Sequence, residues 1–312
     1  MADTSSGTHT RPAQAAQSKW LSKSAAKIVG SDADEVRSHY DISNEFFKLW
    51  QDPNQVYSCA YFERDDMSLE EAQMAKIDLS LGKLGLQPGM TLVDIGCGWG
   101  ATMMRAVEKY DVNVIGLTLS KNQSVYCRHL LEEIDSDRSR QVFLRGWEEF
   151  DEPVDRIVSI EAFEAFGKPR YAAFFETAYR IQPGDGRMVL ETIFTHPPSY
   201  WPTKGIAITM SDLRFMRFIA QEIFPGGQVP SEEDVVEFSR GAGFSLEETR
   251  LLNPHYVRTL DTWVANLEAG RDDAIASTSN EIYERYMRYL TGCADFFRRG
   301  ITEVGQFTLT KG

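Results

Sequence analysis

The apolar positions of this 312-residue chain fall into two alternating patterns from Met90 onward. Stripes of apolar residues three and four positions apart predict helices at 101–110, 121–134 and 169–181. Such alternation is typical of right-handed crossovers and of a parallel sheet covered on both faces, so an α/β fold is expected. Short apolar runs predict the strands of that sheet, at 90–95, 112–117, 141–145, 154–160 and 187–195.

Segments on either side of this core have their own patterns. The aromatic residues at 46, 47 and 50 share one helical face, which indicates either packing on the core or a lid over a pocket. Ser68 and Glu71 form a capping box that begins a helix to Leu84. After the core, the pattern predicts a helix at 231–242, a strand at 244–252, helices at 256–268 and 279–298, and a last strand at 305–310.

The domain organisation follows from where the patterning begins. Residues 1–35 are rich in Ala, Ser, Thr and Gln without an apolar core, which predicts a flexible N-terminal tail. Residues 36–312 are expected to form a single domain with N-terminal lid helices at 36–85 and a helical insert at 196–230. The insert carries an apolar stretch from Leu213 onward that either packs on the sheet or walls an apolar channel.

A glycine-rich turn follows the first strand and precedes a helix. Asp94 stands just before it, and Gly96, Gly98 and Gly100 alternate through it. Such a turn lets a ligand contact bare backbone at a helix N-terminus. A dinucleotide site also needs an acid at the end of the second strand, where this chain has Thr118, Leu119 and Ser120. S-adenosylmethionine is favoured instead, because Asp94 suits its ammonium group.

Composition narrows the function further. The formal net charge of −13 disfavours binding to nucleic acid or to an anionic membrane surface through a basic face. The four cysteines are widely spaced and the histidines lack metal-ligand spacing, so neither a disulfide framework nor a metal site is predicted. Reduced thiols suit a cytoplasmic protein. No apolar run approaches the ~20 residues that span a bilayer.

Six short motifs, in a fixed order, lie between residue 36 and the end of the chain. They are His39 to Asp41, Tyr57 to Phe62, Asp94 to Gly100, Gly116 to Ser120, Gly146 to Phe150 and Glu222 to Gly227. In these motifs the chain resembles the mycobacterial mycolic acid methyltransferases and cyclopropane synthases, most closely the branch of unknown function. The resemblance implies a class I methyltransferase fold with a Rossmann-like, mostly parallel sheet, an antiparallel last strand and a helical cap over an acyl-chain tunnel.

The resemblance also assigns roles in holding the cofactor. It places Tyr57, Ser58, Gly96 and Gly98 at the methionine part of S-adenosylmethionine, and Thr118, Leu119 and Gln123 at the ribose. It also places Trp147 and Glu148 at the adenine. An indole ring stacks on a purine and a carboxylate accepts from its amino group, although Trp147 also fits a plain core residue.

The implied chemistry is methyl transfer to a carbon–carbon double bond, through a carbocation, giving a cyclopropane or methyl-branched product. In the family a bound bicarbonate is thought to act as the base, and Cys59, Glu164 and Tyr256 match three of the positions that hold it. Glu191 stands where the family has histidine, which makes bicarbonate doubtful. We hypothesise that Glu191 replaces bicarbonate; a local hydrogen bond is the alternative. Glu161 is a third acid nearby that also suits capping of the strand end.

Other functions fit parts of the sequence. The cluster of acids also suits a methyltransferase acting on a small amine, and a non-catalytic lipid- or cofactor-binding homologue would keep the same fold. A long apolar tunnel would favour the lipid. The basic residues Arg285, Arg288, Arg298 and Arg299 form either a solvated helix face or a docking site for an acyl carrier protein, and peripheral membrane contact is a further expectation.

Overall fold

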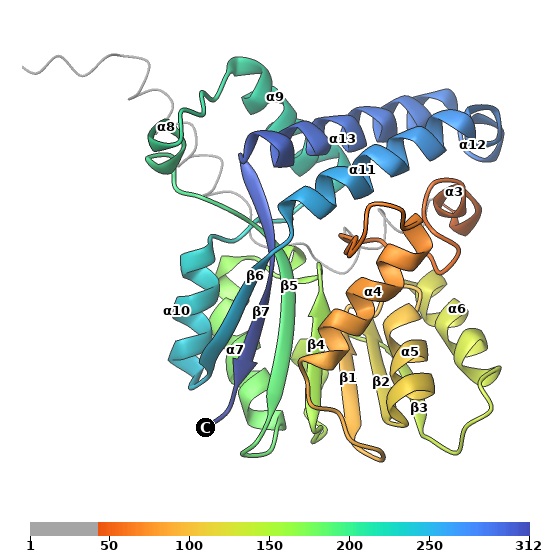
Figure 1. Cartoon of the computed structure of the whole chain (residues 1–312), viewed down its shortest axis with the longest axis vertical. Coiled ribbons are helices and arrows are strands. Elements are labelled where there is room, and N and C mark those ends of the chain that lie inside the picture. The colour runs from red at the N-terminus through yellow and green to blue at the C-terminus, as the bar shows by residue number, and fades with distance from the viewer. Residues whose placement is uncertain (1–42) are drawn as a thin grey trace, which may run out of the picture.

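A single seven-stranded sheet organises the computed structural model, which describes residues 43–312 (Figure 1). The predicted tail at 1–35 and the motif from His39 to Asp41 lie outside these residues. The strand order is β3-β2-β1-β4-β5-β7-β6, and β7 runs antiparallel to both of its neighbours. The expected reversed last strand is therefore confirmed. The strands are β1 (Thr91–Ile95), β2 (Asn113–Thr118), β3 (Arg140–Leu144), β4 (Arg156–Ile160), β5 (Arg187–Thr195), β6 (Ser245–Leu251) and β7 (Thr302–Thr310).

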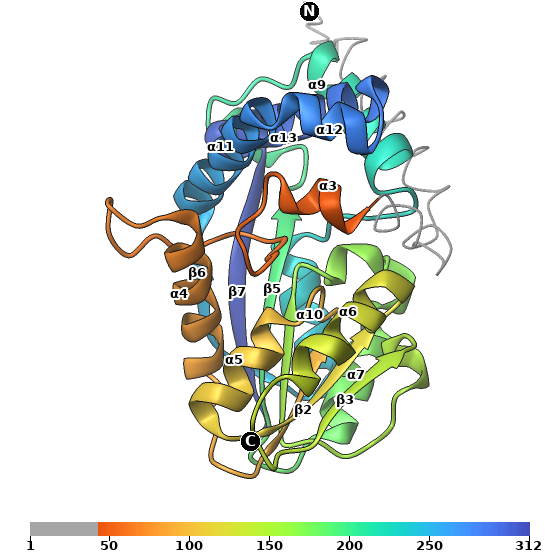
Figure 2. The same ribbon diagram turned by 90° about the vertical axis from the view of Figure 1, so that its right-hand side faces the viewer.

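Helices cover both faces of the sheet, each over its own apolar core (Figures 1 and 2). On one face, Ile77 and Leu81 pack with Met103 and with Leu92 of the sheet. On the other face the core is aromatic and centres on Phe163, which stacks on Tyr171 with ring centroids 4.2 Å apart. The covering helices are α4 (Leu69–Gly82), α5 (Ala101–Tyr110), α6 (Lys121–Glu132), α7 (Tyr171–Ile181) and α10 (Glu232–Ala242).

A helical cap lies above the carboxyl ends of the parallel strands (Figure 2). Its core is a cluster of aromatic rings in which Trp50 meets Trp263 and Phe46 meets Tyr286, at centroid distances of 5.2 and 4.9 Å. The cap elements are α3 (Asn44–Lys48), α8 (Tyr200–Thr203), α9 (Met210–Phe218), the π-helix η4 (Ile219–Ile223), α11 (Asn253–Ala269), α12 (Arg271–Ser277) and α13 (Asn280–Arg299). Three single-turn helices lie between strands, η1 (Trp147–Glu149), η2 (Phe163–Ala165) and η3 (Lys168–Arg170).

Local sequence signals explain most element boundaries. The predicted capping box at Ser68 and Glu71 is present at the start of α4. The last strand begins at Thr302, earlier than expected, because its first residues pair with the end of β5, Thr302 opposite Thr195. The apolar stretch from Leu213 is not one helix, since it changes from α to π geometry after Phe218. Within residues 43–312, no helix is both long and apolar enough to cross a bilayer.

Candidate functional site

The glycine turn leaves an open space beside the backbone at the end of β1. Gly96 and Gly98 both have positive φ angles, of 84° and 54°, which favour glycine. A Cβ atom on Gly96 would lie 2.4 Å from that of Ala162, so this glycine allows β1 and β4 to continue side by side. A Cβ on Gly98 would meet nothing within 4 Å. Gly98 therefore faces a cradle that a ligand can fill.

That cradle is one end of a cavity of about 510 Å³ running from the sheet into the cap. The sheet end is polar and is lined by the turn and by the ends of β2 and β4. The cap end is apolar, with Ile219 and Ala220 of η4 on one side and Cys293 and Phe297 of α13 on the other. The cavity thus joins a polar socket to an apolar channel.

The residues expected around the cofactor surround the polar end of this cavity. Thr118 donates its hydroxyl hydrogen to Gln123 Oε1 at 2.8 Å, which fixes the amide at the start of α6. Asp94 is 2% exposed and its Oδ2 atom has no hydrogen-bond partner among the described residues. Burial raises the pKa of Asp94 to about 7. The expected residues on the wall are Tyr57, Ser58, Asp94, Gly96, Gly98, Thr118, Leu119, Gln123, Trp147 and Glu148.

Trp147 serves the core and the cavity wall at once. Its ring packs at 5.4 Å against Phe174, and only 5% of the residue is exposed. The indole Nε1 atom nevertheless has no partner among the described residues, although a buried N–H normally has one. Glu148 beside it forms an ion pair with Arg170 at 3.0 Å. The unpartnered donor and the cradle at Gly98 both fit a polar, flat ligand such as an adenosyl group.

A carboxyl cluster lies where the polar end meets the apolar channel, and Glu161 is its centre. Cys59 donates its backbone N–H to Glu161 Oε1 at 2.7 Å, and the hydroxyl of Tyr256 donates to Oε2 at 2.5 Å. Glu161 has a φ angle of 48°, which is rare outside glycine and marks strain of the kind found at functional sites. Two segments distant in sequence, those of Cys59 and Tyr256, therefore converge on this one carboxyl group.

Glu191 lies behind Glu161 rather than on the cavity wall. The backbone N–H of Glu161 donates to the carbonyl of Glu191 at 2.8 Å, and the charge of Glu191 acts on the Glu161 carboxyl group. Gln306 donates to Glu191 Oε2 at 2.7 Å from the strand paired directly opposite. Gln306 also bonds to Ser80 on α4 at 2.9 Å. Glu191 is thus a fully buried partner of Glu161.

The protonation states of the cluster follow from burial and mutual charge. Burial raises the pKa of Glu161 well above its ordinary value, and the charges of Glu191 and Glu164 raise it further. Burial also raises the pKa of Glu191, but the charge of Lys76 and the hydrogen bond from Gln306 oppose it. Each of the two carboxyl groups therefore disfavours ionisation of the other, and a negative charge is more favourable on Glu191 than on Glu161.

Glu164 faces the same cavity from η2. Its Oε1 atom accepts the backbone N–H of Ile193 at 2.5 Å, and Oε2 has no partner among the described residues. Burial raises its pKa to about 7. The charge of Glu191 acts on Glu164 as well, whereas the left-handed backbone at Glu161 turns that side chain toward Cys59 and Tyr256.

Other predicted groups have structural partners. The Cys59 thiol points to backbone carbonyls of Ala60 and Leu252 and not into the cavity, so this residue contributes its N–H instead.

Residues 43–312 contain no cluster of His, Cys, Asp or Glu suited to a metal ion. Three of the four predicted basic residues pair with neighbouring acids, and the fourth lies over an aromatic ring. Its contacts are Arg285 with Glu281, Arg298 with Asp261, Arg299 with Asp212, and Arg288 over Phe218.

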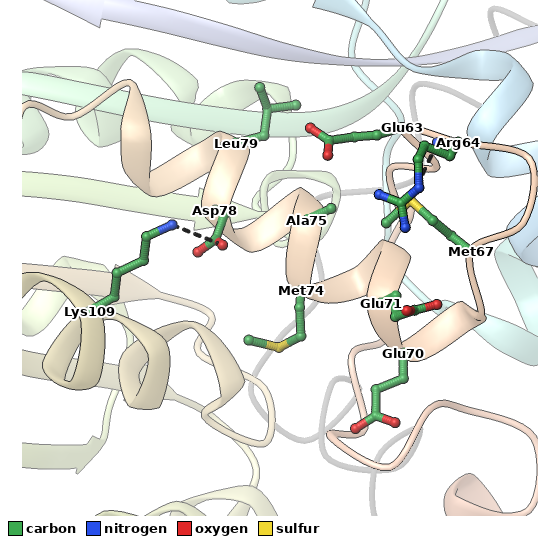
Figure 3. A pocket seen from close by; sticks show the side chains of 10 residues that line it. All are labelled: Glu63, Arg64, Met67, Glu70, Glu71, Met74, Ala75, Asp78, Leu79 and Lys109. Carbon is green, nitrogen blue, oxygen red and sulfur yellow. Dashed lines mark hydrogen bonds and ion pairs between the residues drawn. The ribbon is translucent and has the colours of Figure 1, made fainter.

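A second hollow, of about 720 Å³, lies on the outer face of α4 (Figure 3). Its wall includes Asp78, whose carboxylate forms an ion pair with Lys109 at 2.9 Å. Glu63, Glu70 and Glu71 add acidic groups to its wall, which also contains Arg64 and apolar side chains. The sequence-predicted cofactor and base residues are absent from its wall. The side chains in Figure 3 thus belong to the outer face of α4, whereas Lys76, on its inner face, lines the cavity of the candidate site.

Four residues of the site escaped the sequence analysis or were given minor roles. Glu161 was expected at most to cap a strand. Gln306, Lys76 and Gln55 were not singled out, yet all three are buried around the cavity or its carboxyl cluster. The burial of Lys76 could have been predicted from the sequence, because this residue shares a helix face with Ala72, Gln73, Ile77 and Ser80, which are also buried.

Comparison with known proteins agrees with this architecture. Residues 29–307 match the family model described as mycolic acid cyclopropane synthetase. The chain is 60% identical over 278 residues to the S-adenosylmethionine-dependent methyltransferase UmaA of Mycobacterium tuberculosis, covering 89% of this chain and 97% of that one. It is 59% identical over 276 residues to cyclopropane mycolic acid synthase 1 of the same species, covering 88% and 96%.

Solved structures show the same relationship. The cyclopropane synthase MmaA2 from Mycobacterium tuberculosis superposes with a TM-score of 0.89 at 56% identity, covering 91% of this chain and 99% of that one. The mycolic acid cyclopropane synthase CmaA1 complexed with SAH and CTAB gives a TM-score of 0.88 at 57% identity, covering 90% and 99%. With its sheet order, its glycine turn and these matches, the chain has the S-adenosylmethionine methyltransferase fold and belongs to the mycolic acid cyclopropane synthetase family.

Proposed function

We propose that this protein transfers a methyl group from S-adenosylmethionine to a double bond of a long, mycolic-type acyl chain, giving a cyclopropane or a methyl-branched product. The observation that carries the proposal is the single cavity that joins the polar socket to the apolar channel, with the carboxyl cluster at the junction. The names of the relatives support the same substrate class. A small amine acceptor would not need the apolar walls of η4 and α13.

The socket residues fit the cofactor in polarity and shape. Asp94 has an unpartnered buried oxygen for the ammonium group, and the space over Gly98 accepts the chain that leads to the sulfur. We assign the ribose to the amide of Gln123 and the adenine to Trp147 and Glu148. Bound there, S-adenosylmethionine supplies an electrophilic methyl group on a positively charged sulfur.

The channel residues then control the cation that forms on the acyl chain. The π electrons of the double bond form the new carbon–carbon bond as the carbon–sulfur bond breaks, which leaves a neutral thioether and a carbocation. Aromatic side chains such as Phe215, Phe224 and Tyr289 line the cavity, and ring faces stabilise a cation. The apolar wall also excludes the water that would trap it.

We infer that Glu161 is the base, in the place that bicarbonate takes in the family resemblance. Two of the three residues matched to the bicarbonate site, Cys59 through its backbone N–H and Tyr256 through its hydroxyl, bond to the Glu161 carboxyl group. In this proposal the two carboxyl groups share one proton before the reaction. A proton released by the cation then passes to Glu161 while the shared proton moves to Glu191, so both carboxyl groups become neutral. Burial holds the Tyr256 pKa well above its usual range, which keeps its hydroxyl a donor.

Other aspects of function remain proposals on the same basis. Within the predicted lid segment, α4 covers the sheet, so we propose the role of a lid for the part that contains α3, where Asn44 accepts the Trp99 indole N–H at 3.1 Å and contacts the glycine turn. The free cysteines are consistent with a cytoplasmic protein. An acyl carrier protein as the donor of the chain, and peripheral membrane contact, stay predictions.

The proposal is tested by incubating the purified protein with S-adenosylmethionine and a monounsaturated long-chain acyl lipid, followed by mass spectrometry of the lipid. The expected result is incorporation of one carbon from the cofactor into the alkyl chain. Methylation of an amine head group, or cofactor binding without transfer to any acyl lipid, would contradict it.

A further inference from the structure

Two buried side chains of opposite charge lie on the cavity wall beside the glycine turn. Lys76, on the inner face of α4, is fully buried, and Asp94 in β1 is 2% exposed. Lysine is almost never fully buried unless it is paired with an anion. The hydrogen bond that Lys76 Nζ makes within the protein goes to the neutral Ser58 Oγ atom, at 2.6 Å. An ammonium group has three hydrogens to donate, so it has capacity for a further acceptor.

Asp94 has the complementary capacity. Its Oδ2 atom is buried and has no hydrogen-bond partner among the described residues. Lys76 and Asp94 influence each other electrostatically, yet the described residues include no ion pair between them within 4.0 Å. The wall therefore presents a separated cation and anion to the same space. A ligand with an anionic and a cationic group on neighbouring atoms can satisfy both.

A third polar group faces the same space. Gln55 is 1% exposed, lines the cavity, and has neither amide atom hydrogen-bonded within the described residues. Its φ angle of 53° is strained, and Asp52 holds the loop in place by accepting the backbone N–H of Val56 at 2.8 Å. A strained loop with a buried, unsatisfied amide indicates a position set for ligand contact.

We propose that Lys76 binds the α-carboxylate of the cofactor's methionine end while Asp94 binds its α-ammonium group, so that the two buried charges recognise a zwitterion. Ser58 positions the Lys76 ammonium, and the Gln55 amide lies on the same wall to complete the socket. The inference rests on the proposed function only for the identity of the cofactor. It makes Lys76 a specificity residue for ligands that carry the carboxylate.

The first test uses the wild-type protein and calorimetric titration with two ligands. One is S-adenosylhomocysteine, and the other is the same thioether without the α-carboxylate. The expected result is binding of the second ligand about 10- to 150-fold more weakly, the range of a charge-assisted hydrogen bond to a buried group. Equal affinity for the two ligands would overturn the proposal, whether or not any acyl lipid is methylated.

The second test uses Lys76→Met, with Lys109→Met as the matched control. Lys109 pairs with Asp78 on the opposite, outer face of α4 (Figure 3). Lys76→Met is expected to lose most of its affinity for S-adenosylhomocysteine and to keep its affinity for the analogue without the carboxylate, whereas Lys109→Met binds both as wild type does. If Lys76→Met weakens the binding of both ligands equally, or of neither, the proposal is wrong. Lys76 then contributes only to packing or to stabilising the negative charge of Glu191. If that variant does not fold, the wild-type comparison decides alone.

Discussion

The backbone N–H of Glu161 donates to the carbonyl of Glu191 at 2.8 Å, and the carboxyl group of Glu161 lies on the cavity wall, whereas Glu191 is buried behind it. Cys59 and Tyr256 anchor the outer member, and Gln306 anchors the inner one. The pair supplies a fixed negative charge next to the apolar channel and a place for a proton. If Glu161 is the base, as we propose, turnover does not depend on a dissolved anion.

Removing the outer carboxylate is therefore expected to create a requirement for bicarbonate. Glu161→Gly suits the φ angle of 48° and vacates the space between the Cys59 N–H and the Tyr256 hydroxyl. Turnover should fall by about 10²- to 10⁴-fold, the usual contribution of a general base, and added bicarbonate should restore part of it. The measurement is acyl methylation in carbon dioxide-free buffer with and without bicarbonate.

Wild-type protein is the control for that experiment, and its turnover should not respond to bicarbonate. A wild-type enzyme that stops when bicarbonate is removed would show that Glu161 does not replace the anion. Glu161→Gln, which fills the same space without a charge, should be inactive and should not be rescued.

The pH dependence of turnover reports on the same pair. The active pair carries one negative charge, and burial raises the pKa of Glu191, so activity should be lost on acidification at a higher pH than an ordinary glutamate would require. The sign follows because the raised pKa favours the protonated, neutral pair. A rate profile that stays flat until the pH range of a solvated glutamate would contradict this assignment.

Glu191→Gln separates the roles of the two acids. In this variant the negative charge must lie on Glu161, whose pKa is raised by burial. The charge of Lys76 and the hydrogen bond from Gln306, which lower the pKa of Glu191, do not act in the same way on Glu161. The acid limb of the rate profile should move to higher pH, while activity at alkaline pH is largely kept. Complete loss of activity at every pH would make Glu191 itself the base.

The two glycines of the turn should respond differently to alanine. Gly96→Ala brings its Cβ to 2.4 Å from that of Ala162 at a positive φ, so unfolding free energy should fall by about 2–4 kcal/mol. Gly98→Ala meets open space and should lose only about 1–2 kcal/mol from its backbone conformation, but its methyl group enters the cofactor cradle. Denaturant unfolding and cofactor titration measure the two effects separately.

Narrowing the apolar channel should limit acyl chain length without affecting the cofactor. Ala220 of η4 lines the cavity, whereas its neighbour Gln221 is exposed. Ala220→Phe is expected to reduce turnover of long acyl chains at least about tenfold while leaving cofactor affinity and short-chain turnover close to wild type. Gln221→Phe should change neither. Unaltered long-chain turnover in Ala220→Phe would remove η4 from the channel wall.

The fold could be predicted closely because its signals are local. The capping box at Ser68, the apolar strands and the glycine turn each depend on residues a few positions apart. The cap was harder, since α12 and the change from α to π geometry after Phe218 depend on packing between helices distant in sequence. Such contacts leave no periodic pattern.

The site was only partly predictable for the same reason. Residues of the glycine turn and of the segment around Trp147 follow strand ends, where ligands bind in parallel sheets. The central place of Glu161 instead depends on Cys59, Tyr256 and a left-handed backbone conformation, which meet only in three dimensions. Likewise Gln306 bonds to Glu191 because β7 pairs antiparallel with β5 in one register.

The most direct test of the central claim uses S-adenosylmethionine with a trideuterated methyl group and a monounsaturated long-chain acyl lipid. The account predicts that wild-type protein adds the labelled carbon to the former double bond, and that closure of a cyclopropane loses one deuterium to the carboxyl pair, a loss that Glu161→Gln abolishes. A product that carries the intact label on nitrogen or oxygen, or no labelled lipid at all, would contradict it.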